Sequence, residues 1–264
     1  MRSKLTPADD GSTPGCGIAI IAKASIRGQS KTRLVPPLSF EEAAQCNTAF
    51  LRDVAESISA AAAHAGIGGY AAFGPPQARP FFQQVLPAGI GLIEAWHPDF
   101  SDCLSGTVAA LLERGHHNAV LLNSDSPTLP ASLLVEAAQV LARPGDRVVL
   151  GPASDGGYYL LGLKRRHDRL FRDIAWSTPR VARETLQRAA ELRLPVHLLP
   201  VWYDVDDAET LRMLASELFG GVAFALDLAP GAARHSRALI RSLIENADLR
   251  GRLGLTEAPR RAAE

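Results

Sequence analysis

The sequence has little cysteine and no long apolar run. Its three cysteines, Cys16, Cys46 and Cys103, are far apart and form no CxxC pair, which excludes a disulfide framework and a cysteine-rich zinc site. No segment approaches the roughly 20 apolar residues that a membrane span requires. The first fifteen residues are polar and rich in proline and glycine, so no signal peptide is expected. These features predict a cytoplasmic protein.

The sequence also lacks an excess of either charge. Its 28 lysine and arginine residues equal its 28 aspartate and glutamate residues, so no global field favours nucleic acid or an anionic membrane as partner. Any bound anion must therefore be held by a local site. A length of 264 residues, 47% of them hydrophobic, suits one large α/β domain or two small ones.

Short apolar runs alternate along the chain with segments of helical periodicity. Helices are expected from Ser39, where Ser39 and Glu42 form a capping-box pattern, and after Asp206. The other predicted helices are 77–86, 102–114, 130–142 and 179–192, and the predicted strands are 17–22, 70–73, 90–96, 118–123, 147–150, 158–163 and 196–201. This order predicts an α/β fold with a mostly parallel central sheet and helices on both faces.

The pattern divides the chain into three parts. Residues 1–16 are expected to be a flexible N-terminal segment, and 17–220 to form the α/β domain. Residues 221–264 are predicted to be a helical extension and tail, with an amphipathic helix or helix pair between Arg234 and Leu253. That extension has three possible arrangements: it packs on the core, pairs with a second copy in a homodimer, or remains mobile.

A basic, glycine-containing loop follows the first predicted strand over residues 23–35. It is not a P-loop, because Ser30 rather than glycine precedes Lys31. Backbone N–H groups, lysine and arginine nevertheless suit phosphate oxygens. We therefore interpret the loop, entered through Ala22 and Lys23, as phosphate-binding, with Gly28 allowing close approach and Lys31 and Arg33 supplying charge. The alternative is that Lys31 and Arg33 are solvated surface residues.

Four aspartates follow predicted strands: Asp125, Asp155, Asp204 and Asp206. Ligands of open α/β sheets bind beyond the carboxyl ends of the strands, so these side chains should meet the basic loop at one edge. One or two carboxylates together with substrate phosphates are the usual ligands of Mg²⁺ or Mn²⁺. The sequence thus predicts a nucleotide site with a divalent cation.

Each of these motifs also has a purely structural interpretation. The Ser-Asp-Ser-Pro stretch at 124–127 suits a turn that starts a helix. Asp206 could be the N-cap of the last core helix, with Glu209 three residues later. Gly156 and Gly157 could serve only a turn.

Five motifs together resemble the DUF2064 proteins of the glycosyltransferase-A (GT-A) superfamily, also called selenodomain-associated transferase 1 proteins. They are KTRLVPPLSFEEAA, LLNSDSPTLP, VVLGPASDGGYYLLGL, FRDIAWSTPRV and YDVDDAETL, in the family's order, and the resemblance covers about residues 17–215. The loop KTRLVPPLS is also similar to that of 2-phospho-lactate guanylyltransferases. Where family members carry a GDLGERM-like run, this chain has residues 100–108, FSDCLSGTV.

The resemblance implies a Rossmann-like GT-A fold with a nucleotide in the N-terminal half. It implies a metal on Asp125, with Asp206 as second ligand and Asp204 as its close rival. It also implies an acceptor side formed by Asp155, Gly156, Gly157 and Tyr158, closed by Trp176 and Ser177, in which Asp155 is a candidate base or acceptor ligand.

Three functions follow, of which the first is favoured by the resemblance. The first is metal-dependent glycosyl transfer from a nucleotide-diphosphate sugar to a small acceptor. The second is nucleotidyl transfer, in which a phosphorylated acceptor attacks a nucleoside triphosphate and pyrophosphate leaves. The third is nucleotide binding without turnover, against which the carboxylates argue, because an anion pocket gains nothing from them.

Overall fold

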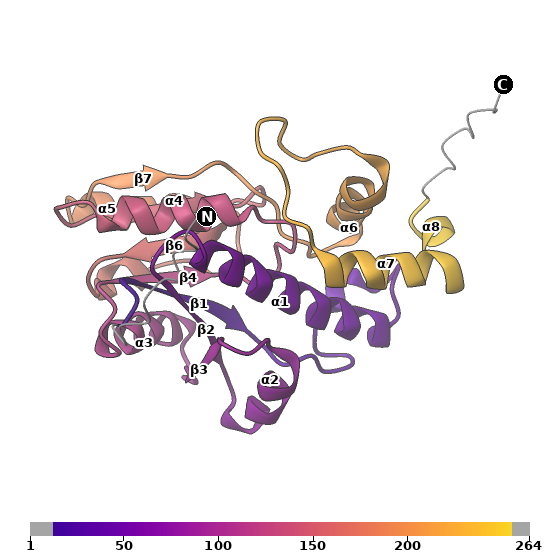
Figure 1. The fold of residues 1–264 in the computed structure, drawn as a ribbon, viewed down its shortest axis with the longest axis horizontal. Helices are drawn as coiled ribbons and strands as arrows, with labels where there is room; N and C mark the ends of the chain where they lie inside the picture. Colours follow the sequence, from indigo (N-terminus) through magenta and orange to yellow (C-terminus); the bar gives the residue numbers. More distant parts are fainter. Residues whose placement is uncertain (1–12, 255–264) are drawn as a thin grey trace, which may run out of the picture.

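The computed structural model describes residues 13–254, which form a seven-stranded sheet with helices on both faces (Figure 1). The strands lie in the order β3-β2-β1-β4-β6-β5-β7. Their bounds are β1 Cys16–Ala22, β2 Ile67–Phe73, β3 Gly91–Glu94, β4 Asn118–Leu122, β5 Val148–Pro152, β6 Tyr158–Leu163 and β7 Val196–Leu198. Within the described chain, β6 alone runs against its neighbours. The predicted mostly parallel α/β sheet is confirmed.

The two faces of the sheet carry different helices. The helices are α1 Phe40–Ala62, α2 Arg79–Val85, α3 Phe100–Glu113, α4 Ala131–Ala142, α5 Val181–Glu191, α6 Ala208–Ala215, α7 Arg234–Asn246 and α8 Leu249–Arg252. Ile18 and Ile20 of β1 pack in the core that α1, α4, α6 and α7 share, whereas Ala19 faces the core under α3 and α5. Strands covered on both faces are apolar throughout, which explains their short continuous apolar runs.

The helix boundaries test two of the predicted caps. Ser39 and Glu42 form the predicted capping box at the start of α1. The predicted N-cap of α6 is displaced by one residue: Asp207, not Asp206, accepts hydrogen bonds from the N–H groups of Glu209 and Thr210. The interpretation of Asp206 as a cap is therefore wrong, and its carboxylate is available for other contacts.

The C-terminal part packs on the sheet's first helix. Helix α7 lies along α1 (Figure 1), and the buried Asp53 carboxylate of α1 accepts hydrogen bonds from the N–H groups of His235 and Ser236. Arg252 of α8 pairs with Glu42 at 2.9 Å. The division at residues 16 and 220 stays a prediction, and residues 1–12 and 255–264 lie outside the described part.

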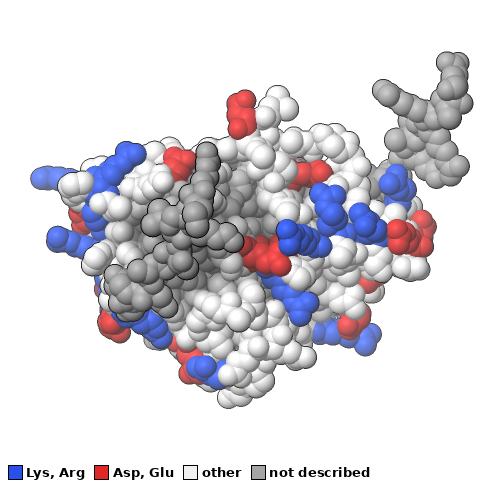
Figure 2. Space-filling view, viewed as in Figure 1, with Lys and Arg blue, Asp and Glu red and all other residues white. Residues whose placement is uncertain are grey.

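The surface mixes both charges over the face shown in Figure 2, as the balanced composition predicts. Between residues 13 and 254, no helix is at once long and apolar enough to cross a membrane.

Candidate active site

Three connections come together at the carboxyl edge of the parallel strands. The basic loop follows β1, Asp125 follows β4, and the segment 202–206 follows β7. Two backbone hydrogen bonds fix this arrangement: the Val205 N–H donates to the Asp125 carbonyl at 2.9 Å, and the Ser154 N–H donates to the Trp202 carbonyl at 2.9 Å. Residues far apart in the sequence thereby share one edge, as their placement after strands predicted.

The segment after β7 presents its carboxylates because its apolar side chains are anchored. Tyr203 and Val205 are fully buried in the core, while Asp204 and Asp206 between and after them are partly exposed. The Tyr203 hydroxyl donates to Glu217 at 2.7 Å and accepts from Thr128 at 3.1 Å, which holds the segment against the end of α6. Alternation along this extended stretch thus directs both acids to the site.

The Lys31 ammonium joins two of the predicted metal ligands. Its Nζ lies 2.9 Å from an Asp125 oxygen, 2.7 Å from an Asp206 oxygen and 2.9 Å from the Val205 carbonyl oxygen. Burial lowers the pKa of Lys31, but the two carboxylates outweigh it and raise the pKa, so the side chain is a cation. Its backbone is in the left-handed region, at φ 51°. Such a conformation is costly for lysine, and the ion pairs offset that cost.

Negative charge is concentrated around this ammonium. Burial, followed by the charges of Asp155, Asp206 and Asp125, raises the pKa of Asp204 to about 7. Carboxylate oxygens are the donors that Mg²⁺ and Mn²⁺ prefer, so the donor set suits a divalent cation. The predicted ligands do not form a compact group of three, however. Within residues 13–254, the group whose three ligand atoms lie within 4.8 Å of one another is Asp53, Glu56 and His235.

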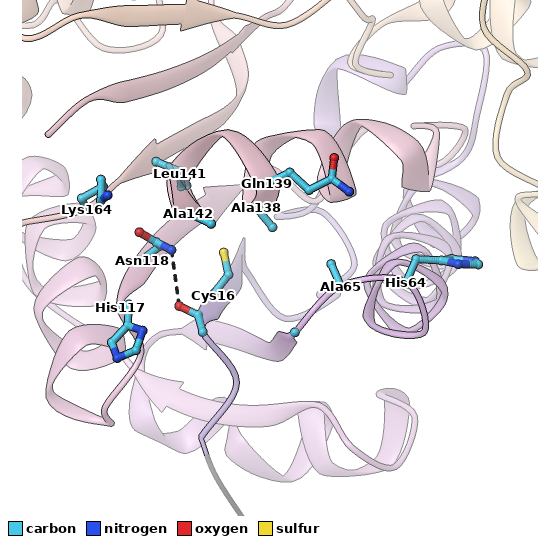
Figure 3. Close-up of a pocket in the computed structure, with 12 residues that line it drawn as sticks. Cys16, His64, Ala65, His117, Asn118, Ala138, Gln139, Leu141, Ala142 and Lys164 are labelled. Atoms are coloured by element: carbon cyan, nitrogen blue, oxygen red, sulfur yellow. Dashed lines mark hydrogen bonds between the residues drawn. The ribbon is translucent and has the colours of Figure 1, made fainter. Parts of the chain in front are cut away.

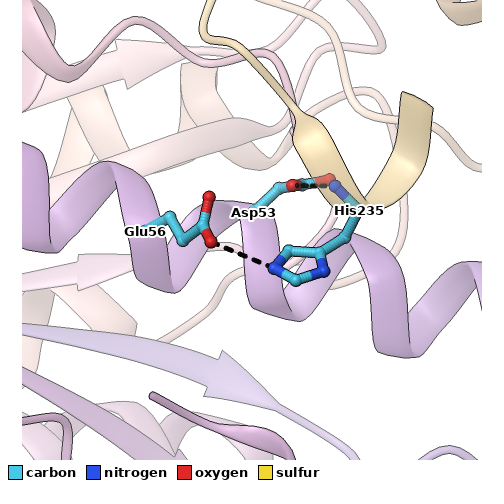
Figure 4. A group of neighbouring side chains, drawn as sticks. All are labelled: Asp53, Glu56 and His235. Carbon is cyan, nitrogen blue, oxygen red and sulfur yellow. Dashed lines mark hydrogen bonds and ion pairs between the residues drawn. The ribbon is translucent and has the colours of Figure 1, made fainter. Parts of the chain in front are cut away.

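That other cluster has a structural role in the packing of α7 (Figure 4). Both Asp53 oxygens accept hydrogen bonds from the first turn of α7, and His235 Nε2 lies 3.0 Å from a Glu56 oxygen. Capping of α7 by the Asp53 carboxylate and pairing of His235 with Glu56 explain this cluster without a metal.

The basic loop is held in shape by residues that sequence analysis did not select. Ser30 Oγ accepts a hydrogen bond from the Ile26 N–H at 2.8 Å and donates to the Ala24 carbonyl at 3.0 Å. Asn47 of α1 donates to the Lys23 carbonyl at 3.2 Å. Asn47 is a buried polar residue on a largely apolar helix face, and this is the signal that could have identified it.

Within the loop, the cations differ in exposure. Lys23 and Arg33 are exposed. The contact of Arg33 with Asp206 is long, at 3.9 Å. Both cations are therefore available to an anion. Gly28 has φ 75°, a conformation that favours glycine, while Ala22 is the buried last residue of β1. That these residues and Lys31 bind phosphate stays a prediction.

A cavity of about 230 Å³ opens beside Asp125. Two predicted acceptor-side residues, Tyr158 and Trp176, line it, together with Ile21, Phe100, Leu104, Leu121, Leu122, Asn123, Ser124 and Tyr159. The Tyr158 hydroxyl and Asn123 Oδ1 are buried without a hydrogen-bond partner. Leaving such groups unpaired costs about 1–3 kcal/mol each. Burial also raises the pKa of Tyr158, so its hydroxyl is protonated.

The other predicted acceptor-side residues do not line this cavity. Asp155 is exposed, and its carboxylate accepts a hydrogen bond from the Gly157 N–H at 2.8 Å. Gly156 has φ 91°, and a Cβ there would lie 2.3 Å from the Pro179 carbonyl oxygen. Gly156 therefore serves the turn between β5 and β6, which is the structural role that the sequence also allowed. Ser177 is exposed.

A second and larger cavity, of about 570 Å³, lies at the opposite edge of the sheet (Figure 3). It is bordered by the first residues of β1 and β4 and by the C-terminal half of α4. Its lining includes Cys16, His64, His117, Asn118 and Gln139. None of these was predicted to bind a ligand.

The fold is that of solved nucleotide-using proteins. A provisionally assigned nucleotide-diphospho-sugar transferase from Desulfovibrio desulfuricans G20 superposes with a TM-score of 0.73 at 23% identity, over 88% of this chain and 96% of that one. CMP:2-keto-3-deoxy-manno-octonic acid synthetase complexed with CTP gives 0.50 at 15% identity, over 78% and 99%. A cytidylyltransferase from Leptospira borgpetersenii gives 0.50 at 12%, over 92% and 98%. These likenesses show a GT-A-like fold.

At the level of sequence, a comparison with curated proteins found no match. The family model described as "Uncharacterized protein conserved in bacteria (DUF2064)" matches residues 57–178, which include Asp125, Asp155 and Trp176. The basic loop and Asp206 lie outside the matched range. Residues 57–178 therefore carry the DUF2064 pattern, and the resemblance that the sequence motifs indicated is confirmed.

Proposed function

We propose that the protein is a metal-dependent glycosyltransferase that moves a sugar from a nucleotide-diphosphate sugar to a small acceptor. One observation carries the proposal: the Lys31 ammonium contacts both Asp125 and Asp206, so the basic loop and the acidic residues form one site. The likeness to the Desulfovibrio protein, which is assigned to nucleotide-diphospho-sugar transfer, supports this reaction over others.

Each part of the site has a role in this reaction. Asp125 and Asp206 would hold Mg²⁺ or Mn²⁺, with Asp204 as the alternative ligand. When bound, such a cation stabilises the negative charge of a departing diphosphate. Lys23 and Arg33 are exposed cations that bind the phosphate oxygens, Arg33 through its bidentate fork. Asp155, whose side chain is exposed, is the candidate to accept the proton of the acceptor hydroxyl.

Nucleotidyl transfer is the second candidate, because the fold is shared with a synthetase complexed with CTP and with a cytidylyltransferase. The two reactions use the same kind of metal site and differ in the bond that breaks. Glycosyl transfer releases a nucleoside diphosphate, whereas nucleotidyl transfer releases pyrophosphate.

A thermal-shift panel tests the proposal. UDP-, GDP-, ADP- and dTDP-sugars and the nucleoside triphosphates are added singly, each with Mg²⁺, with Mn²⁺ or with a chelator. A ligand that binds only the folded state raises its stability by RT ln(1 + [L]/Kd). We expect a metal-dependent shift with one diphosphate sugar. A shift with a triphosphate alone would favour nucleotidyl transfer, and no shift with any nucleotide would contradict both.

Asp206 and Asp207 give a matched pair of variants for the same assay. Asp207→Ala removes the N-cap of α6, so it should lower the free energy of unfolding by about 1 kcal/mol and leave the metal-dependent shift intact. Asp206→Ala leaves the cap intact and should abolish the metal-dependent shift. A normal shift in Asp206→Ala would remove this residue from the metal site.

A further inference from the structure

One large aromatic side chain at the carboxyl edge has no part in the site described above. Trp96 follows β3 and is 61% exposed, whereas Trp176 is half-buried and Trp202 is fully buried. Single exposed apolar residues are common on protein surfaces, so exposure alone does not mark Trp96 as functional. Its support, its position in the sheet and the charges around it distinguish it.

The connection that carries Trp96 is fixed at both ends. The Ala95 N–H donates to the Phe73 carbonyl at 2.9 Å, which continues the pairing of β3 with β2 by one residue. Asp99 caps α3, because its carboxylate accepts a hydrogen bond from the Ser101 N–H at 2.7 Å. A short connection held in this way gives the side chain of Trp96 a defined position.

The indole ring of Trp96 lies against the backbone at Gly74, the residue that follows β2. A Cβ at Gly74 would lie 2.7 Å from Trp96 Cε3 and 3.1 Å from Trp96 Cβ, so the absence of a side chain makes room for the ring. The ring is therefore supported from the protein side, while most of the residue is open to solvent. A supported, exposed aromatic ring is the kind of surface on which nucleobases stack.

The register of the sheet relates this ring to the basic loop. Ala22 is in register with Phe73, and Phe73 with Glu94, so β1, β2 and β3 end at the same level. Neighbouring strands lie about 4.8 Å apart, so the start of the basic loop and the connection of Trp96 are separated by two spacings, about 10 Å. This separation is comparable to the length of a nucleoside diphosphate from its base to its phosphates.

The charges at the two ends of this span match the two ends of a nucleotide. Lys23 and Arg33 are exposed cations of the loop that follows β1, and they suit phosphate oxygens. Beside Trp96, the charge of Glu94 is balanced by Arg79, whose Nη2 lies 2.7 Å from it. The phosphates of a nucleotide are anionic and its base is flat and uncharged, so the aromatic end suits the base.

From these observations we propose that Trp96 binds the base of the donor nucleotide by stacking, with the phosphates directed to Lys23 and Arg33. The proposal rests on the proposed function, which it deepens by assigning a residue to the base. It applies equally to a nucleotide-diphosphate sugar and to a nucleoside triphosphate. Every base has a flat face, so stacking on Trp96 contributes affinity and leaves the choice of base to hydrogen bonds.

Three variants test the role of the ring. UDP, CDP, GDP and ADP are titrated into the full chain with Mg²⁺ by isothermal calorimetry, and the tightest of them is taken to the variants. Trp96→Ala should weaken its binding about tenfold, a change of about 1.4 kcal/mol, and Trp96→Phe, which keeps an aromatic face, should retain most of the affinity. Leu226→Ala truncates a side chain that is 96% exposed between α6 and α7, and this control should leave the affinity unchanged.

Inorganic pyrophosphate separates a contact with the base from a contact with the phosphates. It has no base, so Trp96→Ala should leave its affinity unchanged, whereas Arg33→Ala should weaken both pyrophosphate and the nucleoside diphosphate. Equal weakening of the two ligands by Trp96→Ala would indicate a general disturbance of the site and would contradict the proposal. Unchanged affinity of Trp96→Ala for the nucleoside diphosphate would contradict it as well.

Fluorescence gives an independent measure of the contact, since a base stacked on an indole ring quenches its emission. Trp96→Phe should still bind the nucleotide but lose most of the quenching, although Trp176 and Trp202 remain. Full quenching in Trp96→Phe would place the base elsewhere and overturn the proposal. If none of the four diphosphates binds the unaltered protein, the proposed function fails together with this inference. If one binds equally well to Trp96→Ala, this inference alone fails.

Discussion

The two cavities at opposite edges of the sheet differ more in chemistry than in size. The cavity at the amino edge is the larger, at about 570 Å³ against about 230 Å³ beside Asp125 (Figure 3). Yet none of the unpaired buried polar atoms found in the described chain belongs to its lining, whereas Asn123 and Tyr158 of the smaller cavity each contribute one. Unsatisfied polar groups among the lining residues, and not volume, distinguish the smaller cavity from the larger one.

The reason lies in how each edge satisfies its own polar groups. At the amino edge, the Gly15 carbonyl accepts hydrogen bonds from the N–H groups of His117 and Asn118, and the Lys164 ammonium donates to the Arg143 carbonyl. At the carboxyl edge, carboxylates crowd together and share one buried lysine. The polar groups named at the amino edge are already hydrogen-bonded and need no ligand. The excess of carboxylates at the carboxyl edge is typical of a functional site.

The largest expected effect is that of Asp125→Asn. The amide keeps the size of the side chain but removes the charge that would hold a cation, so metal-dependent transfer should fall by about a hundredfold or more. Initial rates of nucleoside diphosphate release measure this, with circular dichroism as the control for folding. Activity near that of the unaltered protein would show that Asp125 has no role in the reaction. It would also weaken the functional contrast between the carboxyl and amino edges of the sheet.

A pH dependence should distinguish the acidic edge. The pKa of Asp204 is raised to about 7 in the folded protein, above its ordinary value near 3.8, so the folded state binds the extra proton between these pH values. The stability that protonation of Asp204 gives the folded protein is therefore complete below pH 3.8 and is lost as the pH rises through 7. In metal-free buffer, Asp204→Asn should remove this loss, so that its gain in urea midpoint over the unaltered protein is larger at pH 8 than at pH 5. Equal gains at both pH values would contradict it.

Lys31 offers a third test, which concerns competition between cations. Its ammonium lies between two predicted metal ligands, so in the absence of nucleotide it opposes a metal there. Lys31→Met should increase the affinity for Mn²⁺ alone by about tenfold, a change of 1.4 kcal/mol, and weaken nucleotide binding. Electron paramagnetic resonance of free Mn²⁺ measures the first effect. Arg33→Ala is the control: it should weaken nucleotide binding but change the Mn²⁺ affinity much less, because Arg33 is exposed and its closest approach to Asp206 is 3.9 Å.

Local patterns in the sequence were sufficient for the mostly parallel sheet and for the meeting of Asp125 and Asp206 at one edge of it. The capping box at Ser39 and the apolar runs that became strands are short-range signals, and the placement of acids after strands put Asp125 and Asp206 at one edge. The cap at Asp207 was missed by one residue, because adjacent aspartates are equivalent in sequence and only the backbone geometry selects between them.

Contacts between distant segments could not be predicted. Lys31 was interpreted as a phosphate ligand, and nothing in its local sequence indicates that its ammonium reaches Asp206, 175 residues away. In the same way, Asn123 lies beside the predicted metal ligand, but its unpaired oxygen depends on the packing of β6 and α3 around it. Such properties arise from tertiary packing and not from periodicity.

The smallest expected effect is at the amino-edge cavity. Gln139 is exposed on α4 and lines that cavity, but no hydrogen bond in the described chain depends on its side chain. Gln139→Ala should therefore change the free energy of unfolding by less than about 0.5 kcal/mol and leave transfer and metal affinity unaltered. Urea titration, initial rates of nucleoside diphosphate release and electron paramagnetic resonance of free Mn²⁺ measure these quantities. If Gln139→Ala impaired transfer as Asp125→Asn is expected to do, the amino-edge cavity would take part in the reaction, and the contrast between the two cavities would no longer locate the site.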